Sequence, residues 1–332
     1  TAIAAQVGTG IIVGVAGAIL TGGPGAVFWM WVISFFGMAT IYAEATLAQE
    51  TRIVELDGTI KGGPVYYITT AFQGKFGKFL AGFFAVAITL ALGFMGCMVQ
   101  SNSIGATMET AFGIPSWVVG IVLIVICAFI FLGGVQRLAS VTEKVVPLMA
   151  AVFLFGGLIV LVVRIKYIPE TFAMIFRYAF EPQAIIGGGF GYAIKLAISQ
   201  GAKRGLFSNE SGMGSAPLVV SAAQTRNPVR QALVSATGTF WDTVVVCLMT
   251  GLVLVSTIMK NPAVDMASIA NGGQMTTAAF AQIPYIGPLI LMVSIITFAY
   301  STILGWSYYG ERAAEYLLGK KAILPYKVLF IA

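Results

Sequence analysis

The chain has 332 residues, of which 58% are hydrophobic and only 10% charged, and its formal net charge is +6. This balance lies far outside the composition of soluble domains and indicates a polytopic membrane protein. There is no histidine, and the three cysteines, Cys97, Cys127 and Cys247, lie in apolar runs without CxxC spacing. A disulfide framework or a metal cluster is therefore not expected, and positive charges dispersed between apolar segments favour a membrane over a nucleic-acid partner.

Apolar segments of the length that crosses a bilayer, about 20 residues, recur along the chain. They are predicted at about 2–20, 25–49, 77–111, 115–132, 145–163, 184–222, 232–258 and 288–318, with the start of a ninth at 323–332. Because the first begins at once, without an initiator methionine, and the ninth is cut short, we expect segments of the natural protein to be missing at both ends.

Two of these segments are interrupted by polar, glycine-rich sequence. The first contains Val7-Gly-Thr-Gly10, and the sixth contains KRGLFSNESGMGSAP, from Lys203 to Pro217. The helix breaks are predicted near Gly8–Gly10 and within Gly201–Gly214. Lipid offers no partners for freed backbone groups, so such sequence must be buried in protein or line a water-filled cavity. Each interruption is followed by a Phe-Trp pair, Phe28-Trp29 and Phe240-Trp241. Broken helices in corresponding positions of two halves are typical of the binding site of a secondary transporter.

Loop segments are predicted to carry little chemistry. The stretch from Lys166 to Pro182, with alternating aromatic residues, is expected to lie at the membrane interface, and that from Asn261 to Gln282 to be a polar loop over the outer face.

Basic residues are distributed unevenly between the two sides of the predicted bundle. With the amino end in the cytoplasm, twelve lie inside and four outside, which is the bias of the positive-inside rule. The twelve are Arg52, Lys61, Lys75, Lys78, Arg137, Lys144, Arg226, Arg230, Arg312, Lys320, Lys321 and Lys327, and the four are Arg164, Lys166, Arg177 and Lys260.

Glycines and hydroxyls supply the first candidate site residues. Unwinding at Gly8–Gly10 would free backbone carbonyls for a cation, although Gly10 and Gly14 also have the GxxxG spacing of close helix packing. Ser301 and Thr302 place adjacent hydroxyls on an apolar helix, where they either bind a hard cation or bond back to their own helix. These alternatives stay open on the residues alone.

Amide, aromatic and charged residues within the spans are the other candidates. Gln100 lies deep in the third span, where an unpaired amide is costly. Trp306 shares a helical face with Thr302 and forms either core packing or a pocket wall. Asp242, near the middle of its span, is a candidate coupling carboxylate, whereas Glu44 is expected to pair with a basic loop residue. Lys203 and Arg204 are expected to pair with Glu210 across the break. No nucleophile–base pair or nucleotide motif favours an enzyme.

Seven strings in this sequence resemble the alanine/glycine:cation symporters, the sodium:alanine symporter family. They are VGTGIIVGVAGAI, GGPGAVFWMW, FFGMATIYAEATLA, KGGPVYY, SNESGMGSAP, RQALVSATGTFWDT and FAYSTILGWSYYGE, spread from Val7 to Glu311. The resemblance implies an all-α, leucine-transporter-like fold of two inverted five-helix repeats, each with a broken first helix. A single transporter domain over residues 1–332 is then expected, with the first repeat at about 1–165 and an incomplete second repeat at about 183–332.

The function implied by the resemblance is symport of alanine or glycine with sodium into the cell, by alternating access across the cell membrane. No cofactor is expected beyond sodium as the coupling ion, and the oligomeric state is left open. Proton coupling through Asp242 or Glu210 is the alternative within this fold. A channel and a non-transporting structural membrane subunit are the alternatives from other classes.

Carried over motif by motif, the resemblance assigns two sets of site residues. The substrate residues are Gly8, Thr9, Gly10, Gln100, Phe207, Thr302 and Trp306, and the sodium residues are Ala4, Val7, Ser301 and Thr302. One position departs from the family pattern, which usually reads GTGN, because Ile11 stands in place of the asparagine.

Overall fold

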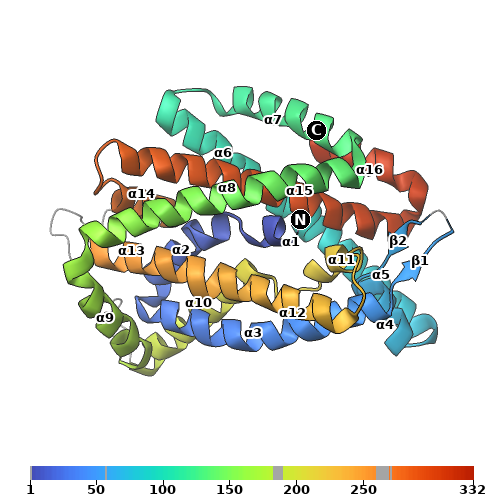
Figure 1. The fold of residues 1–332 in the computed structure, drawn as a ribbon, viewed down its shortest axis with the longest axis horizontal. Coiled ribbons are helices and arrows are strands. Elements are labelled where there is room, and N and C mark those ends of the chain that lie inside the picture. Colours follow the sequence, from blue (N-terminus) through green and yellow to red (C-terminus); the bar gives the residue numbers. More distant parts are fainter. Residues whose placement is uncertain (1, 57, 182–189, 259–268, 270) are drawn as a thin grey trace.

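Long apolar helices make up most of the computed structural model, which describes residues 2–56, 58–181, 190–258, 269 and 271–332 (Figure 1). Five helical stretches among these residues are long and apolar enough to cross a membrane. They are α3 (Gly25–Glu50), the run α5 (Gly74–Leu90), η2 (Ala91–Gly96) and α6 (Cys97–Phe112), α8 (Gly134–Val163), the run α12 (Pro228–Thr239), η4 (Phe240–Cys247) and α13 (Leu248–Ile258), and α15 (Ile286–Leu318). Both η2 and η4 are turns of π-helix. Shorter helices α7 (Ser116–Leu132) and α16 (Ile323–Ile331) complete the predicted order of spans.

The first predicted break is present. The chain forms α1 (Ala2–Gln6), the 3₁₀ turn η1 (Thr9–Ile11) and α2 (Val13–Gly22). At the break the amide of Gly8 donates to the carbonyl of Gln6 (2.9 Å) rather than to that of Ala4, which a continuous helix would use. The amide of Ile11 likewise donates to Gly8 (3.3 Å) and not to Val7. The carbonyls of Ala4 and Val7 are thereby released from helical bonding.

The second break is narrower than the prediction. Helix α10 (Phe190–Asn209) continues through Gly201 and Gly205, the chain unwinds over residues 210–215, and α11 (Ala216–Val220) follows; residues 184–189 of the predicted element lie outside the described part. Gly201 and Gly205 do not unwind because they let α10 approach α3. A side chain at Gly201 would lie 2.5 Å from the carbonyl oxygen of Ala26. The unwound part instead contains left-handed residues, with φ of 57° at Glu210, 80° at Gly212 and 71° at Gly214.

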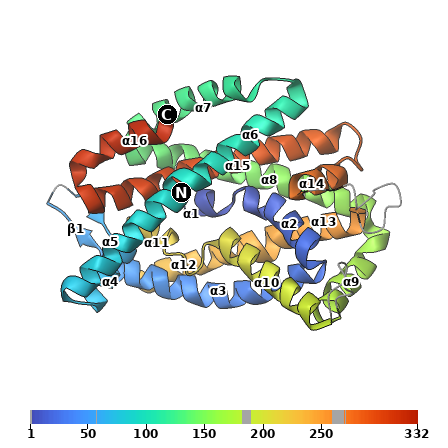
Figure 2. The ribbon, with the colours of Figure 1, turned by 180° about the vertical axis from the view of Figure 1, so that it is seen from behind.

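The two breaks meet inside the bundle. The side-chain amide of Gln6 donates to the carbonyl of Asn209 at 3.2 Å, and both atoms are buried. Figures 1 and 2 show α1 and α2 running between α8 and α15 on one side and α3, α10 and α12 on the other. Two unwound segments that are distant in sequence therefore line one interior region, where freed backbone groups can meet a ligand.

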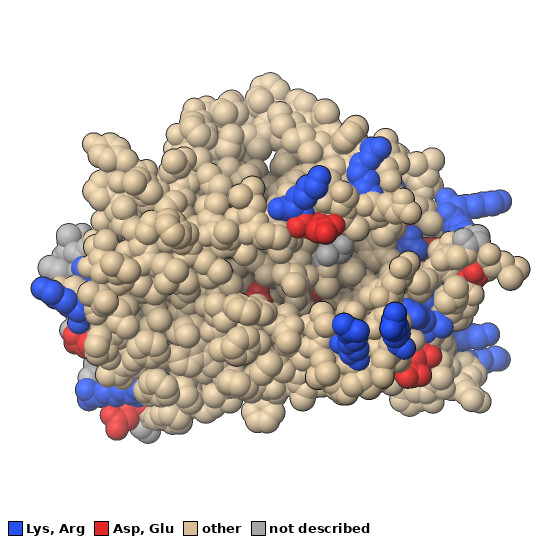
Figure 3. Space-filling model, viewed as in Figure 1, with Lys and Arg blue, Asp and Glu red and all other residues tan. Residues whose placement is uncertain are grey.

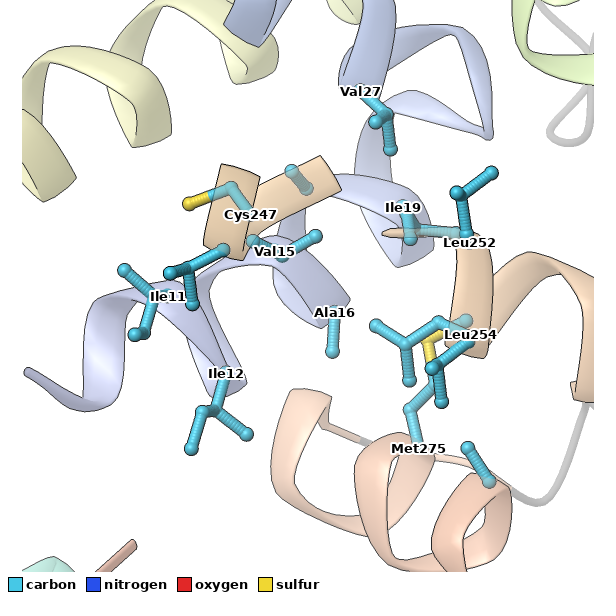
Figure 4. Close-up of a cluster of buried hydrophobic side chains, with 14 of the residues drawn as sticks. Ile11, Ile12, Val15, Ala16, Ile19, Val27, Cys247, Leu252, Leu254 and Met275 are labelled. Atoms are coloured by element: carbon cyan, nitrogen blue, oxygen red, sulfur yellow. The ribbon is translucent and has the colours of Figure 1, made fainter. Parts of the chain in front are cut away.

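An apolar core packs around α2, as Figure 4 shows. Its side chains come from the first broken helix, α3, η4, α13 and α14 (Gly272–Phe280), and include Ile11, Ile12, Val15, Ala16, Ile19, Val27, Cys247, Leu252, Leu254 and Met275. Helix α14 corrects the prediction of a polar loop from Asn261 to Gln282 where it covers that segment, whereas residues 261–268 and 270 lie outside the described part. Gly272 approaches the backbone of α2 so closely that an added methyl group would overlap the carbonyl of Val13.

Charged side chains concentrate at the two ends of the bundle, and a broad uncharged surface separates them (Figure 3). At one end lies the amphipathic helix α9 (Ile168–Phe180), in the predicted interfacial segment. At the other end lies an antiparallel hairpin of β1 (Ile53–Val54) and β2 (Ile60–Lys61), followed by α4 (Pro64–Ala71). Ion pairs join the hairpin to the end of α15, because Lys61 lies 2.6 Å from Glu55 and 3.7 Å from Glu315.

Acidification should loosen this hairpin only at a pH below the ordinary pKa of a glutamate side chain. The ammonium groups of Lys320 and Lys61 hold the pKa of the Glu55 carboxyl below its usual 4.5. A group whose pKa is lowered by folding stabilises the fold above its unfolded pKa and loses that effect as the pH falls through the folded pKa. We expect hydrogen exchange of the hairpin amides, corrected for the intrinsic rate, to stay constant down to about pH 5 and to accelerate below pH 4.5. With Lys320→Gln the acceleration should begin at higher pH, and an unchanged onset would show that the ion pair contributes nothing.

Candidate functional site

The residues assigned to the substrate lie in one connected group. The hydroxyl of Thr9 donates to Oε1 of Gln100 at 2.9 Å, and both side chains are buried. Across from them, a methyl group added at Gly10 would lie 3.6 Å from the ring of Phe207. The Phe207 and Trp306 rings meet edge to face with centroids 6.2 Å apart. The first break, α6, α10 and α15 thus each contribute side chains or backbone to this connected group.

The residues assigned to the cation lie beside this group. Gly8 packs directly against the side chain of Thr302, and Oγ of Ser301 lies 3.5 Å from the carbonyl oxygen of Val7. The Ser301 hydroxyl also bonds back to its own helix, at 2.9 Å from the carbonyl of Phe298. Thr302 is fully buried, and its hydroxyl oxygen has no hydrogen-bond partner among the described residues.

The donor set at this place fits a hard monovalent cation. Every ligand atom it offers is an oxygen, from the released carbonyls of Ala4 and Val7 and from the hydroxyls of Ser301 and Thr302. An unpaired buried hydroxyl such as that of Thr302 costs free energy unless something binds it. The geometry therefore supports a cation here, although back-bonding accounts for part of the Ser301 interaction.

Glu210 is buried at the second break and connects it to α15. Its Oε1 accepts from Nε1 of Trp306 at 2.8 Å, and its Oε2 accepts from the hydroxyls of Ser215 at 2.8 Å and Tyr309 at 2.9 Å. The predicted pairing of Glu210 with Lys203 and Arg204 is wrong, because both basic side chains are exposed on the outer part of α10. Sequence reasoning missed Tyr309, although its position three residues after Trp306 places it on the same helical face.

Glu44 also has a different partner from the one predicted. Its carboxylate accepts the backbone amides of Gly212 and Gly214, each at 3.1 Å, instead of pairing with a basic loop residue. These amides are exposed to Glu44 because left-handed glycines turn the backbone of the second break toward α3. Glu44 therefore fixes the shape of the break and has no contact with the substrate group.

Asp242 lies in a polar cluster behind the pocket. Its Oδ2 accepts from the hydroxyls of Ser208 at 2.7 Å and Thr243 at 2.9 Å, and Thr243 in turn accepts from the side-chain amide of Asn209 at 3.3 Å. The departure from the family pattern, Ile11, is fully buried in the apolar core of Figure 4.

A cavity of about 330 Å³ reaches the first break from the side of α8 and α12. Its lining combines apolar and polar side chains: Ala2, Ile3, Gln6, Thr142, Glu143, Val146, Pro147, Ala216, Val220, Gln231, Val234, Ser235 and Gly238. Gln6, which joins the two breaks, is part of this lining, so the cavity extends from the edge of the bundle to the interior region.

Comparison with known proteins gives consistent results. The profile of the sodium:alanine symporter family matches residues 1–332. The sodium/alanine symporter AgcS of Methanococcus maripaludis is 46% identical over 332 residues, which cover 100% of this chain and 72% of that protein. The amino-acid carrier protein AlsT of Bacillus subtilis is 38% identical over 333 residues, covering 99% of this chain and 68% of that protein.

The fold also has a counterpart among solved structures. A crystal structure of a mutant manganese transporter of Eremococcus coleocola matches with a TM-score of 0.63 at 14% sequence identity, over 99% of this chain and 68% of that chain. At such low identity the likeness bears on the fold alone. It confirms the predicted all-helical, leucine-transporter-like fold class.

Proposed function

Because the chain belongs to the sodium:alanine symporter family, we propose that it carries alanine, or a similarly small amino acid such as glycine, into the cell together with sodium. The observation that carries this proposal is the junction of the first break with α15. There Thr302, whose hydroxyl has no partner among the described residues, packs against Gly8, and the Ser301 hydroxyl lies 3.5 Å from the released carbonyl oxygen of Val7. These oxygens, with the released carbonyl of Ala4, would be the ligands of the ion. Sodium bound there would join the two halves of the fold physically.

The substrate would bind with its carboxylate at the unwound backbone of Gly8–Gly10 and near the amide of Gln100. Backbone amides at an interrupted helix are the usual partners of a substrate carboxylate in transporters of this kind. The edge-to-face rings of Phe207 and Trp306 would occupy the side-chain end of the pocket. This leaves room for little beyond a methyl group, which supports alanine or glycine over a larger amino acid.

We place the protein in the cell membrane with its amino end toward the cytoplasm. The twelve basic residues assigned to the inside, against four outside, support this orientation. Figure 3 shows lysine and arginine side chains gathered toward the end of the bundle that carries the hairpin, which would then face the cytoplasm.

Uptake of labelled alanine into proteoliposomes, with and without an inward sodium gradient, tests the proposal. Accumulation above equilibrium that requires the gradient supports sodium symport. Saturable accumulation without sodium would contradict sodium coupling, equilibration without accumulation would indicate a channel, and no movement at all would indicate a structural subunit. Competition by glycine, but not by a large amino acid, is expected from the small pocket.

Removing the two hydroxyls of the cation group should weaken sodium coupling. Replacing both Ser301 and Thr302 by alanine is expected to raise the sodium concentration for half-maximal uptake by about tenfold, the effect of losing an interaction of about 1.4 kcal/mol. Ser294→Ala is the matched control, because that buried hydroxyl on the same helix bonds only to the carbonyl of Ile290. If the double variant keeps wild-type sodium dependence, both hydroxyls serve only their own helix.

A further inference from the structure

Asp242 is a buried carboxylate, and one of its two oxygens has no hydrogen-bond partner among the described residues. The side chain lies in the π-helical turn η4 and is 1% exposed. Ser208 and Thr243 both donate to Oδ2, whereas Oδ1 has no partner among the residues that the structure describes. One turn earlier the buried hydroxyl of Thr239 is also unpaired. Turns of π-helix occur frequently at functional sites because they displace side chains from the regular helical ladder.

No basic group neutralises this carboxylate. Within the described part of the chain, no lysine or arginine nitrogen lies within 4.0 Å of Asp242. Burying an unpaired ionised carboxylate costs several kcal/mol, so such a group takes up a proton or a cation instead. Two titratable groups, Glu210 and Cys247, act on it electrostatically, and neither supplies positive charge.

The remaining charged or titratable groups on the elements packed against η4 do not compensate Asp242. On α3, Glu44 is engaged by the amides of the second break, and Tyr42 packs against a separate apolar cluster with Ala45. The other described charged side chains on these elements are exposed, and they are Glu50 on α3, Lys195, Lys203 and Arg204 on α10, and Arg230 on α12.

Glu210, the other fully buried carboxylate nearby, differs in its hydrogen bonds. Both of its oxygens accept hydrogen bonds, from Trp306 on one side and from Ser215 and Tyr309 on the other. Tryptophan Nε1 can only donate, so it fixes Oε1 of Glu210 as an acceptor. Its three donors favour the ionised form of Glu210 against the burial that opposes it, and any charge on Glu210 further disfavours a second charge on Asp242.

Between the cavity beside the first break and Oδ2 of Asp242 lie polar groups of Gln6, Asn209 and Thr243. Gln6 lines that cavity and donates to the carbonyl of Asn209. The Asn209 side chain donates to Thr243, which donates to Asp242. Gly238, another lining residue, lies one helical turn before Asp242, and a methyl group there would be 3.1 Å from Oε1 of Gln6.

We propose that Asp242 is a proton-binding site that takes up one proton through this cavity and releases it once in each transport cycle. A hydronium ion in the cavity transfers its proton to Oδ1, which leaves a water molecule and a neutral carboxyl group, and on release the O–H bond breaks and the proton returns to water. A second sodium ion fits less well, because sodium needs several oxygen atoms to replace its hydration shell. Here Ser208 and Thr243 direct their hydrogens, not their lone pairs, toward the carboxylate. The inference rests on the proposed transport function and adds a proton to it.

Proteoliposomes that contain the full-length protein and a pH-sensitive dye test the proposal. Alanine uptake under a sodium gradient should change the internal pH in the wild type. Asp242→Asn should keep sodium-driven uptake. Its alanine-dependent pH change should be smaller than that of the wild type by about tenfold or more, which corresponds to the loss of at least about 1.4 kcal/mol of proton binding. Glu50→Gln is the matched control, because this exposed carboxylate on α3 does not line the cavity, and its pH change should match that of the wild type.

The outcomes separate this inference from the proposed function. If the wild type shows no uptake, the transport proposal fails; if it shows sodium-driven uptake without proton movement, only the role of Asp242 fails. Loss of the pH change in Glu50→Gln, or its retention in Asp242→Asn, would also overturn the assignment. A sodium-to-alanine ratio that falls in Asp242→Asn would assign the site to sodium instead.

Ser208→Ala provides a second variant that keeps the carboxylate. It removes one donor to the ionised form, so the pH midpoint of the proton movement should shift to higher pH. An unchanged midpoint would contradict the proposal even if Asp242→Asn fails to fold.

Discussion

Gly8→Ala should abolish sodium-driven uptake while the protein still folds. A Cβ at this position would overlap Oγ1 of Thr302 and lie 3.4 Å from both Cβ and Cγ2 of the same side chain. The backbone of Gly8 is extended, with φ of −114° and ψ of −165°, so alanine meets no backbone strain. The added methyl group instead occupies the space between the first break and α15, where Thr302 is fully buried and has no room to retreat. We expect uptake to fall by about 100-fold or more, corresponding to roughly 2.7 kcal/mol of lost binding.

Gly82→Ala on α5 is the control for the Gly8 variant. Its Cβ would meet nothing within 4 Å, and alanine favours a helix over glycine by about 1 kcal/mol, so uptake and stability should match or exceed those of the wild type. Sodium-dependent uptake and folded yield are measured for both variants. Near-normal uptake by Gly8→Ala would show that the contact with Thr302 is not part of the transport site.

Glu210→Ala should destabilise the protein more than removal of any one of its partners. The substitution leaves Nε1 of Trp306 and the hydroxyls of Ser215 and Tyr309 without their acceptor. Each unsatisfied buried donor costs about 1–3 kcal/mol, and partial rearrangement leaves an expected loss of about 3–5 kcal/mol. The unfolding temperature in detergent, followed by tryptophan fluorescence, should fall by roughly 5–10 °C.

Two milder variants calibrate the Glu210 effect. Glu210→Gln keeps an acceptor for Trp306 and nearly the same volume, and Tyr309→Phe removes a single donor, so each should cost about 1 kcal/mol. Uptake should follow the same order, because Glu210 holds Trp306 at the pocket. A Glu210→Ala variant that unfolds at the wild-type temperature would mean that these hydrogen bonds contribute no net stability.

The predicted fold was accurate where the sequence carries a local signal. Apolar runs long enough to cross a bilayer can be identified from the sequence alone. The glycines at 8 and 10 are likewise a local signal for an interrupted helix. Gly201 and Gly205 look the same in the sequence, yet they remain helical because they contact the backbone of α3, a partner more than 150 positions away. The local sequence shows that a glycine can unwind a helix or allow close helix packing, but it does not show which of the two occurs.

The predictions for the candidate site were also right for some residues and wrong for others. The resemblance to a family supplied Gln100, Phe207 and Trp306, and the structure brings them together with Gly10 and Thr9. Pairing by charge failed for Glu44 and Glu210, because their partners are backbone amides, an indole and hydroxyls. Such neutral donors are present throughout the sequence, so only three-dimensional proximity selects them.

Helix α1 has only five residues and rests on α15 at a near-backbone contact. A methyl group at Gly305 would lie 2.5 Å from Cβ and 2.8 Å from Cα of Ala5. The oxygens assigned to sodium lie on the two sides of this same contact, with the Val7 carbonyl on one and the Ser301 hydroxyl on the other. Any movement that lifts α1 from α15 therefore also dismantles the ion's shell. Under sodium symport, the movement of α1 away from α15 and the release of sodium would therefore occur in the same step, without a further conformational change to couple them.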